Sequence, residues 1–345
     1  MSMLEAVPAK LEGLLDPAWL TGALYDLGDG ERVVDARAVD SMKTIASKVR
    51  FEAVVEGPDG TRRTRHYCVK GGFDDDGSTG AILALEARVY RELAPVVGLR
   101  VPYAAYAETE EGSGRSVIVL EDLVAAEATF LNALTPYSLE TVRGTLGQLA
   151  QLHAATWGQE GMARFSWLPP RMDVRMPIDM LQGLLDDGRG PDLPPYLRDA
   201  ETVTEAMARG RDEAPVCVAH GDAHSGNAYV DRDGQAGWYD WQCAHRGHWA
   251  TDVSYHLGTA LDIETRRRHE ADLLRFYLDE LARHGVEPPA WDDAWEDYAL
   301  HFAYGYYLWA ITRFHNRAVV VEHIPRLGTA IVDHDTYARL GIETG

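Results

Sequence analysis

The segment His220-Gly221-Asp222-Ala223-His224-Ser225-Gly226-Asn227 is followed, after a short predicted strand, by Tyr239-Asp240-Trp241-Gln242. The two segments place an Asp, an Asn and a second Asp on adjacent loops. Phosphoryl transfer needs a group that accepts the proton of the acceptor hydroxyl, and oxygen ligands that hold magnesium against the phosphates. The three side chains have the chemistry for these tasks, so the pattern predicts phosphoryl transfer.

The segments before this stretch predict an antiparallel sheet with one helix. Alternating apolar residues indicate strands, and apolar residues at steps of three and four indicate a helix. The predicted strands are Arg32–Ala38, Val49–Glu56, Thr64–Lys70, Val101–Tyr106 and Ser116–Leu120, with a helix at Thr79–Leu93 after the third strand.

The rest of the chain predicts a mainly helical region. Pro136–Trp157 reads as a strong helix, and several more are expected after residue 262. Residues 158–215 are rich in Pro, Gly and Asp and read as an insertion with its own helices, near Ile178–Leu185 and Tyr196–Ala208. A further helix from Trp291 carries an aromatic stripe, a pattern more typical of a core than of a ligand site.

Composition narrows the possible partners. The chain has 345 residues, 46% of them hydrophobic, and its 54 acidic against 33 basic residues give a net charge of -21. Such a charge opposes binding to nucleic acid and to anionic membranes, so neither is expected as a partner. The three cysteines form no Cys-x-x-Cys pair, and the first twenty residues lack a secretory signal pattern. We therefore expect a cytoplasmic protein with reduced thiols, and the oligomeric state is left open.

The double motif resembles the aminoglycoside phosphotransferase family, and particularly its branches similar to choline and ecdysteroid kinases. The resemblance covers the chain from about Trp19 to the last helices. It implies an α+β, bilobal protein-kinase-like fold, with a small antiparallel-sheet lobe carrying one helix and a larger helical lobe. The predicted boundaries are 1–122 for the nucleotide-binding lobe and 123–345 for the catalytic and substrate-binding lobe, which contains the 158–215 insertion.

The resemblance also assigns roles within the double motif. It implies that Asp222 is the catalytic base and that Asn227 and Asp240 are the magnesium ligands. Asp252 matches the family's structural Asp, which braces the catalytic loop from the next helix.

A nucleotide site is expected in the first lobe. Lys70 ends a strand and Glu86 lies in the following helix, which matches the kinase pair that contacts the α and β phosphates. Glu92 is a weaker rival for the helix partner. Glu121 and Leu123 match the hinge whose backbone binds adenine.

The predicted loop between the first two strands, Asp40–Lys48, contains no glycine. Protein kinases cover the phosphates here with a glycine-rich loop. Ser41, Thr44 and Ser47 are candidates to supply hydroxyl and backbone donors instead, and a plain solvated turn is an equal alternative.

We therefore expect an ATP-dependent, Mg²⁺-dependent kinase that phosphorylates a hydroxyl of a small molecule. A protein kinase is a poorer match, because Gly221 replaces the usual Arg and the segment from Asp240 to Asp252 is too short for peptide docking. A catalytically silent nucleotide-binding protein is a further alternative. A zinc site built from histidines and aspartate is the least favoured, and it would use His220, Asp222, His224, His245 and His248.

The expected acceptor is a hydroxylated compound of mixed polarity. The insertion carries carboxylates suited to an aminoglycoside, but its arginines offset them. It also carries Met172, Met176 and Met180, and the aromatic helix that follows carries Tyr304, Tyr307 and Trp309. These side chains favour a less polar skeleton.

Overall fold

The computed structural model describes residues 7–43, 46–73, 80–135, 137–210, 216–313 and 315–344. Contacts divide the chain into two compact units. The first comprises Met1–Thr129 with Asp231–Asp233, and the second comprises Phe130–Val230 with Gly234–Gly345. No helix in the described ranges is long and apolar enough to span a membrane.

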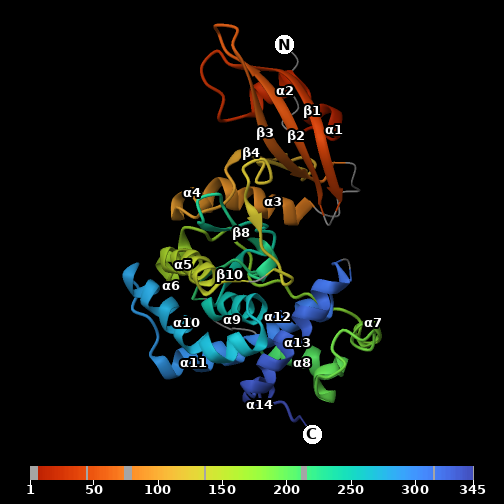
Figure 1. The fold of residues 1–345 in the computed structure, drawn as a ribbon, viewed down its shortest axis with the longest axis vertical. Helices are drawn as coiled ribbons and strands as arrows, with labels where there is room; N and C mark the ends of the chain where they lie inside the picture. Colours follow the sequence, from red (N-terminus) through yellow and green to blue (C-terminus); the bar gives the residue numbers. More distant parts are fainter. Residues whose placement is uncertain are drawn as a thin grey trace. The chain divides into compact units, whose positions relative to one another are not determined.

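The first unit is built on a five-stranded antiparallel sheet in the order β1-β2-β3-β5-β4 (Figure 1). The strands are β1 (Arg32–Lys43), β2 (Ser47–Glu56), β3 (Arg62–Gly71), β4 (Ala104–Thr109) and β5 (Ser116–Glu121). Burial alternates along β2, so one face of the sheet is covered. That face packs a core around the stacked rings of Phe51 and Tyr67.

Two short helices close this core. They are α1 (Leu11–Leu14) and α2 (Pro17–Ala23). Asp16 begins α2, because its carboxylate accepts the backbone N–H groups of Ala18 and Trp19 and Pro17 needs no acceptor at the first helical position. Trp19 then packs edge-on against Tyr106 of β4 in the core.

The hairpin between β1 and β2 is longer than its sequence pattern predicts. Asp40–Lys43 pairs with Ser47–Arg50, so most of the predicted Asp40–Lys48 loop is strand. The register shifts between Ala38 and Asp40, and a bulge of this kind reverses which residues face the core. The alternation in the sequence is therefore interrupted, although the ladder of hydrogen bonds continues.

The helix predicted at Thr79–Leu93 changes type within that range and continues past its predicted end. α3 (Gly80–Arg88) leads into a π-helical turn at Val89–Leu93 and then into α4 (Ala94–Val97). Gly98 ends α4 in the left-handed conformation that glycine adopts without strain.

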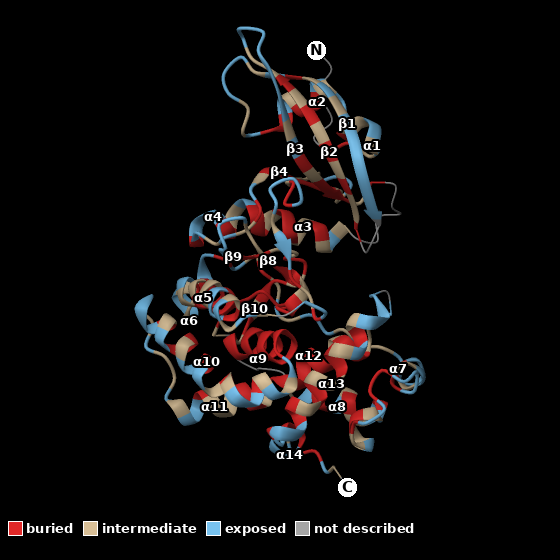
Figure 2. Cartoon of the chain, viewed as in Figure 1, coloured by how far each residue is buried: buried red, intermediate tan, exposed pale blue. Residues whose placement is uncertain are grey.

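The second unit is mainly helical. Its longer helices are α5 (Leu139–Ala155), α6 (Gly158–Ala163), α7 (Ile178–Leu185), α8 (Ala200–Arg209), α9 (Trp249–Ala260), α10 (Ile263–Arg283), α11 (Trp291–Leu300), α12 (Phe302–Ala310) and α13 (Arg317–Asp333), and α14 (Thr336–Arg339) lies near the C-terminus. A 3-10 turn at Pro195–Arg198 precedes α8. Figure 2 shows α9 buried along its whole length. The core of the unit is therefore assembled around this helix.

Short strands lie between α8 and α9. β7 (Cys217–Ala219) pairs antiparallel with β10 (His245–Gly247), and β8 (Ala228–Val230) pairs antiparallel with β9 (Ala236–Trp238). β6 (Thr129–Phe130) adjoins β8. The loops of the double motif leave and enter these strands, so the sheet pairs fix where the loops begin and end.

The sequence predicts a single helix for the aromatic stripe, but in the structure the stripe is divided between two helices, α11 and α12. His301 separates α11 from α12, and its ring Nδ1 lies 2.6 Å from the carbonyl oxygen of Asp297. This carbonyl is the acceptor that the backbone N–H of His301 would use in an unbroken helix, so the side chain competes with the helix. Tyr298, Phe302, Tyr306 and Trp309 are buried, as expected for core residues.

Candidate active site

The loop at residues 220–227 is anchored to α9 by Asp252. One carboxylate oxygen accepts the backbone N–H of His220 at 2.6 Å, and the other accepts that of Gly221 at 2.9 Å. Asp252 is fully buried. It therefore braces the loop from the next helix, as expected from the sequence.

Other polar groups hold the Asp252 carboxylate. His153 of α5 places its Nε2 3.1 Å from Asp252, and the Tyr277 hydroxyl lies 2.7 Å from the other ring nitrogen. Burial alone would raise the pKa of Asp252, but the hydrogen bond and charge of His153 and the N–H of Gly221 outweigh it and lower the pKa. The carboxylate is therefore kept ionised.

Gly221 can be replaced by no other residue without moving the backbone. Its φ is +79°, and an added Cβ would lie 2.1 Å from the carbonyl oxygen of Cys243. The hydroxyl of Tyr304 donates to the Gly221 carbonyl at 2.6 Å. The loop therefore crosses the segment after Asp240 at a distance that only glycine allows.

Asp222 accepts hydrogen bonds from two side chains. Its Oδ2 accepts from Asn227 Nδ2 at 2.9 Å, and its Oδ1 accepts from the Tyr255 hydroxyl at 3.2 Å. The side chain keeps 28% of its surface exposed. Burial, followed by the nearby charge of Asp240, raises the pKa of Asp222 to about 6.

Asn227 is oriented by the same loop. Its Nδ2 also donates to the backbone carbonyl of Asp222 at 2.8 Å, so the carboxamide nitrogen is committed to Asp222 twice. The carboxamide oxygen is the atom left to serve as a ligand for a cation.

His220 joins the two loops of the double motif. Its Nδ1 accepts the backbone N–H of Asp222 at 3.2 Å, and its Nε2 donates to the carbonyl of Tyr239 at 3.2 Å. Burial lowers its pKa, so the ring stays neutral in this bridge. Tyr239 N in turn donates to the carbonyl of Asn227 at 3.0 Å, which brings the residue before Asp240 against the Asp222 loop.

Asp240 has a left-handed backbone, with φ of +64°. Few residues other than glycine adopt this conformation, although Asp tolerates it better than most. Asp240 lies two residues after the end of β9, the strand that pairs with β8. It is a strained position of the kind that clusters at functional sites.

The arrangement does not favour zinc. No group of three or more His, Cys, Asp or Glu side chains within the described ranges is placed to hold a metal ion. His224 uses its Nδ1 to accept the N–H of Gly226, and burial lowers its pKa to about 3. His248 stacks on His301.

In the first unit, Lys70 and Glu86 form a buried ion pair. Lys70 Nζ lies 2.7 Å from Glu86 Oε2, and their side chains are 4% and 1% exposed. Glu92 instead pairs with Arg88 and Arg91 on its own helix. Of the two candidate helix partners, the structure joins Glu86 to Lys70.

The other described nucleotide-site candidates lie on or close to β1, β2 and β5. Ser41 and Ser47 are in the paired strands of the β1–β2 hairpin, and Thr44 lies outside the described residues. Glu121 ends β5 and accepts the N–H of Tyr103 through its side chain. Leu123 is buried, and its carbonyl accepts the N–H of Ala128.

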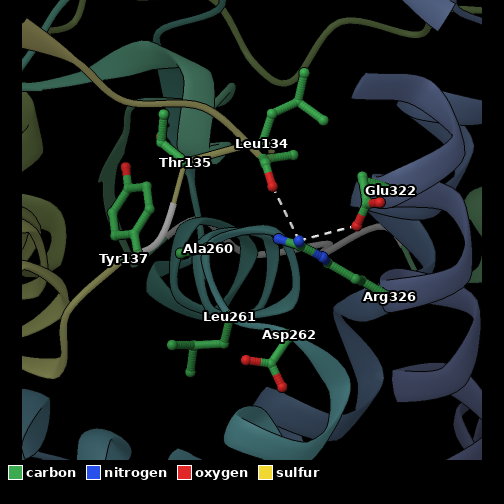
Figure 3. A pocket seen from close by; sticks show the side chains of 9 residues that line it. Leu134, Thr135, Tyr137, Ala260, Leu261, Asp262, Glu322 and Arg326 are labelled. Carbon is green, nitrogen blue, oxygen red and sulfur yellow. Dashed lines mark hydrogen bonds and ion pairs between the residues drawn. The ribbon is translucent and has the colours of Figure 1, made fainter. Parts of the chain in front are cut away.

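A pocket of about 410 Å³ lies in the second unit (Figure 3). Its polar lining includes Tyr137, Asp262, Glu322 and Arg326. The Arg326 guanidinium reaches across it to the carbonyl of Ala133 and to Glu322, and also donates to the carbonyl of Thr259. The Tyr137 hydroxyl donates to the carbonyl of Ser225, so one wall of the pocket contacts the 220–227 loop.

Several groups around this loop are not evident from the sequence. Tyr255, Tyr304 and His153 contact residues 33, 83 and 99 positions away. The sequence offers only their helical spacing, which any buried aromatic residue shares. No signal in the sequence separates them from ordinary core residues.

Comparisons with known proteins give the family and the fold of the chain. The model of a family described as "Phosphotransferase enzyme family" matches residues 61–306. The spectinomycin phosphotransferase APH(9)-Ia, solved with ADP and spectinomycin, gives a TM-score of 0.54 at 12% identity, covering 96% of this chain and 100% of its own. APH(2")-IIia, solved with GDP and kanamycin, gives 0.51 at 12% identity, covering 91% and 97%.

These identities establish the fold alone. The α+β, bilobal protein-kinase-like fold that the sequence predicts is confirmed by them. No curated protein matches the chain.

Proposed function

Because the chain belongs to the phosphotransferase enzyme family, we propose that it is an ATP-dependent kinase that transfers the γ-phosphate to a hydroxyl of a small molecule. One observation carries this proposal. The Asn227 carboxamide holds the Asp222 carboxylate through its nitrogen and keeps its oxygen for a cation. A base and a metal ligand are thereby set side by side, which is what in-line phosphoryl transfer requires.

Asp222 accepts the proton of the acceptor hydroxyl. Its hydrogen bonds from Asn227 and Tyr255 fix the direction of the carboxylate, and the pKa of about 6 matches a base that works near neutral pH. His220 and Asp252 hold the loop beneath it. Their backbone and ring hydrogen bonds keep the carboxylate still while the hydroxyl approaches.

Asn227 and Asp240 are the proposed ligands of Mg²⁺. Their donor set fits the ion, because one carboxamide oxygen and one carboxylate are hard oxygen donors on neighbouring loops. When bound, the ion would neutralise charge on the β and γ phosphates. The left-handed backbone of Asp240 is consistent with a side chain held in position for such a purpose.

Lys70 is the proposed contact to the α and β phosphates, with Glu86 as its anchor. A flexible ammonium group needs a fixed partner to stay aimed at one place, and Glu86 supplies it at 2.7 Å. Ser41, Thr44 and Ser47 are proposed hydrogen-bond donors to the phosphates, and Glu121 and Leu123 are proposed adenine contacts.

The acceptor is proposed to be a hydroxylated compound of low charge. In the insertion, Asp187 is paired with Arg189 and Arg317, and Asp173 is paired with Arg175. Carboxylates engaged in this way offer less to an aminoglycoside with several ammonium groups. Met172 and Met180, in the same insertion, are exposed and offer apolar surface.

The test replaces Asp222 with Asn. The variant should bind ATP with magnesium as the wild type does, and its turnover should fall by roughly a hundredfold to ten-thousandfold. Asp279→Asn, an exposed position on α10, is the matched control and should leave turnover unchanged. Turnover of Asp222→Asn within a few-fold of wild type would exclude Asp222 as the base.

A panel of acceptors tests the substrate class. Acceptor-stimulated ADP release should be saturable with neutral or weakly charged alcohols. Efficient phosphorylation of an aminoglycoside with no turnover of the alcohols would overturn the proposed class. ATP binding without turnover of any acceptor would favour a silent nucleotide-binding protein.

A further inference from the structure

Lysine is rare in this chain and is concentrated in one part of it. Only four of the 33 Lys and Arg residues are lysines, namely Lys10, Lys43, Lys48 and Lys70. The other 29 are arginines. Three of the four lysines lie on β1, β2 and β3, between residues 43 and 70. These strands also carry arginines, but they are the part of the chain where most of its lysines are found.

Two of these lysines are cross-strand partners. Lys48 of β2 lies directly opposite Lys70 of β3 in the antiparallel register. Side chains of directly opposed residues project from the same face of a sheet and are neighbours. Directly opposed like charges repel each other, and the ion pair with Glu86 offsets the charge of Lys70.

Arg50 of β2 is a third cation on the same face of the sheet. Arg50 lies opposite Cys68, two positions along each strand, and its guanidinium is committed to the buried carboxylate of Asp122 at 2.9 Å. Lys70 is likewise held by Glu86. Lys48 thus adds a positive charge to the face of the sheet that carries Lys70, the proposed phosphate contact.

The hairpin that carries Lys48 lacks the usual means of binding phosphate. The tip between β1 and β2 contains no glycine, and most of the expected loop is paired strand. Backbone N–H groups in a ladder are used for pairing and are not available to cradle a phosphate. A side-chain donor next to the tip can take over part of that task.

We propose that Lys48 is a second phosphate-binding lysine, which contacts the polyphosphate of the nucleotide from the strand opposite Lys70. This inference rests on the proposed kinase function and adds a binding residue to it. Lysine suits the position because its ammonium is a compact point charge that follows a phosphate chain, whereas arginine favours a fixed planar partner. The sheet would bring two ammonium groups to one polyphosphate, one anchored by Glu86 and the other supplied by β2.

The expected effect lies on nucleotide affinity. Lys48 contacts the phosphates before and during transfer alike, so its loss should raise KM for ATP while kcat changes little. Loss of one charged contact corresponds to about a tenfold to hundredfold change in binding. Adenosine has no phosphate and should bind equally well to wild type and variant.

The experiment titrates the full-length protein with MgATP, MgADP and adenosine, and compares Lys48→Met with Lys48→Arg. Lys48→Met should weaken binding of both phosphorylated ligands and leave adenosine unaffected, and Lys48→Arg, which keeps the charge, should lose less affinity than Lys48→Met. Lys10→Met is the matched control, because Lys10 is exposed at the start of α1. Wild-type affinity for MgATP in Lys48→Met would overturn the inference, as would an equal loss of adenosine.

A second measurement does not depend on a folded variant. Wild-type protein is treated with an amine-acetylating reagent with and without saturating MgATP, and the four lysines are followed by mass spectrometry. MgATP should slow the labelling of Lys48 and leave that of Lys10 unchanged. Equal labelling of Lys48 in both states would refute the contact.

The two proposals fail in different ways. If wild-type protein binds no ATP, the kinase function itself fails. If wild type binds MgATP and Lys70→Met weakens that binding while Lys48→Met does not, the function stands and only the role of Lys48 is wrong.

Discussion

Gly221 and Gly234 share a backbone conformation and differ in their surroundings. Both have φ near +80°, but an added Cβ at Gly221 would lie 2.1 Å from a carbonyl oxygen, whereas at Gly234 it would meet no atom within 4 Å. Substituting each glycine by alanine therefore distinguishes two contributions to the loss of stability. One is the strain of a left-handed backbone, and the other is the clash with a neighbouring backbone segment.

We predict that Gly221→Ala lowers the free energy of unfolding by about 2–5 kcal/mol, since backbone strain and a clash with Cys243 add together. Gly234→Ala should cost only about 1–2 kcal/mol. Denaturant unfolding of the two variants measures both values. Equal losses would show that Cys243 moves away freely and that the loop is not held against it.

A second prediction concerns Asp252 and pH. Its folded pKa lies below that of the unfolded chain, so its ionisation stabilises the fold above about pH 4, the usual pKa of Asp. That contribution is lost as the pH falls through the lowered folded pKa. The difference in unfolding free energy between wild type and Asp252→Asn should be full at pH 7 and should shrink below about pH 4. A difference that stays constant down to pH 3 would contradict the assignment.

For single residues, the sequence predicts which side chains of one short motif lie together. Asp222 and Asn227 are five positions apart, and the structure joins them by a hydrogen bond. Tyr255 and Tyr304 complete the surroundings of the loop from distant helices, and only the fold brings them there. Short-range spacing is visible in a sequence, whereas a contact between distant residues depends on how the helices pack.

At the scale of elements, the Lys70–Glu86 pair connects β3 to α3. Both side chains are buried, so removing one partner leaves a charge without compensation. We predict that Glu86→Gln lowers the unfolding free energy by about 3–5 kcal/mol. Glu92→Gln on the π-helical turn that continues α3 is the control, because its partially exposed pairs contribute about 1 kcal/mol or less.

A double-mutant cycle with Lys70→Met and Glu86→Gln tests the pairing itself. The double variant should be more stable than the sum of the two single losses implies, since it leaves no buried charge unpaired. Strictly additive losses would mean that the two side chains do not interact.

The elements themselves could largely be predicted, because apolar periodicity reports strands and helices directly. Two departures have local causes. The bulge after Ala38 conceals the continuation of β1, and the ring of His301 ends α11 by taking the carbonyl of Asp297. Both depend on a single residue acting against the pattern around it.

At the scale of the whole molecule, the chain forms two units with separate cores, around Phe51 and Tyr67 in the first and around α9 in the second. The proposed nucleotide residues belong to the first unit and the proposed metal ligands to the second.

We predict that ATP with magnesium raises the Tm by a few degrees, because a ligand at a hundred times its Kd adds about 2.7 kcal/mol. Removal of magnesium with a chelator should reduce this shift in wild type. Asp240→Ala should show the reduced shift whether or not magnesium is added. A shift in Asp240→Ala that still depends on magnesium would refute the metal assignment.

The turn between β8 and β9 has a consequence for dissecting the protein by gene truncation. Asp231–Asp233 belongs by its contacts to the first unit, and Asp231 accepts a hydrogen bond from Arg100, although the strands on both sides belong to the second. A gene fragment ending at residue 129 would encode the sheet without this piece, and the complementary fragment would carry it with no Arg100 to bind. The segment between Asn227 and Asp240 thus contains residues of both units. A single break in the gene therefore cannot yield two fragments that each contain one complete unit.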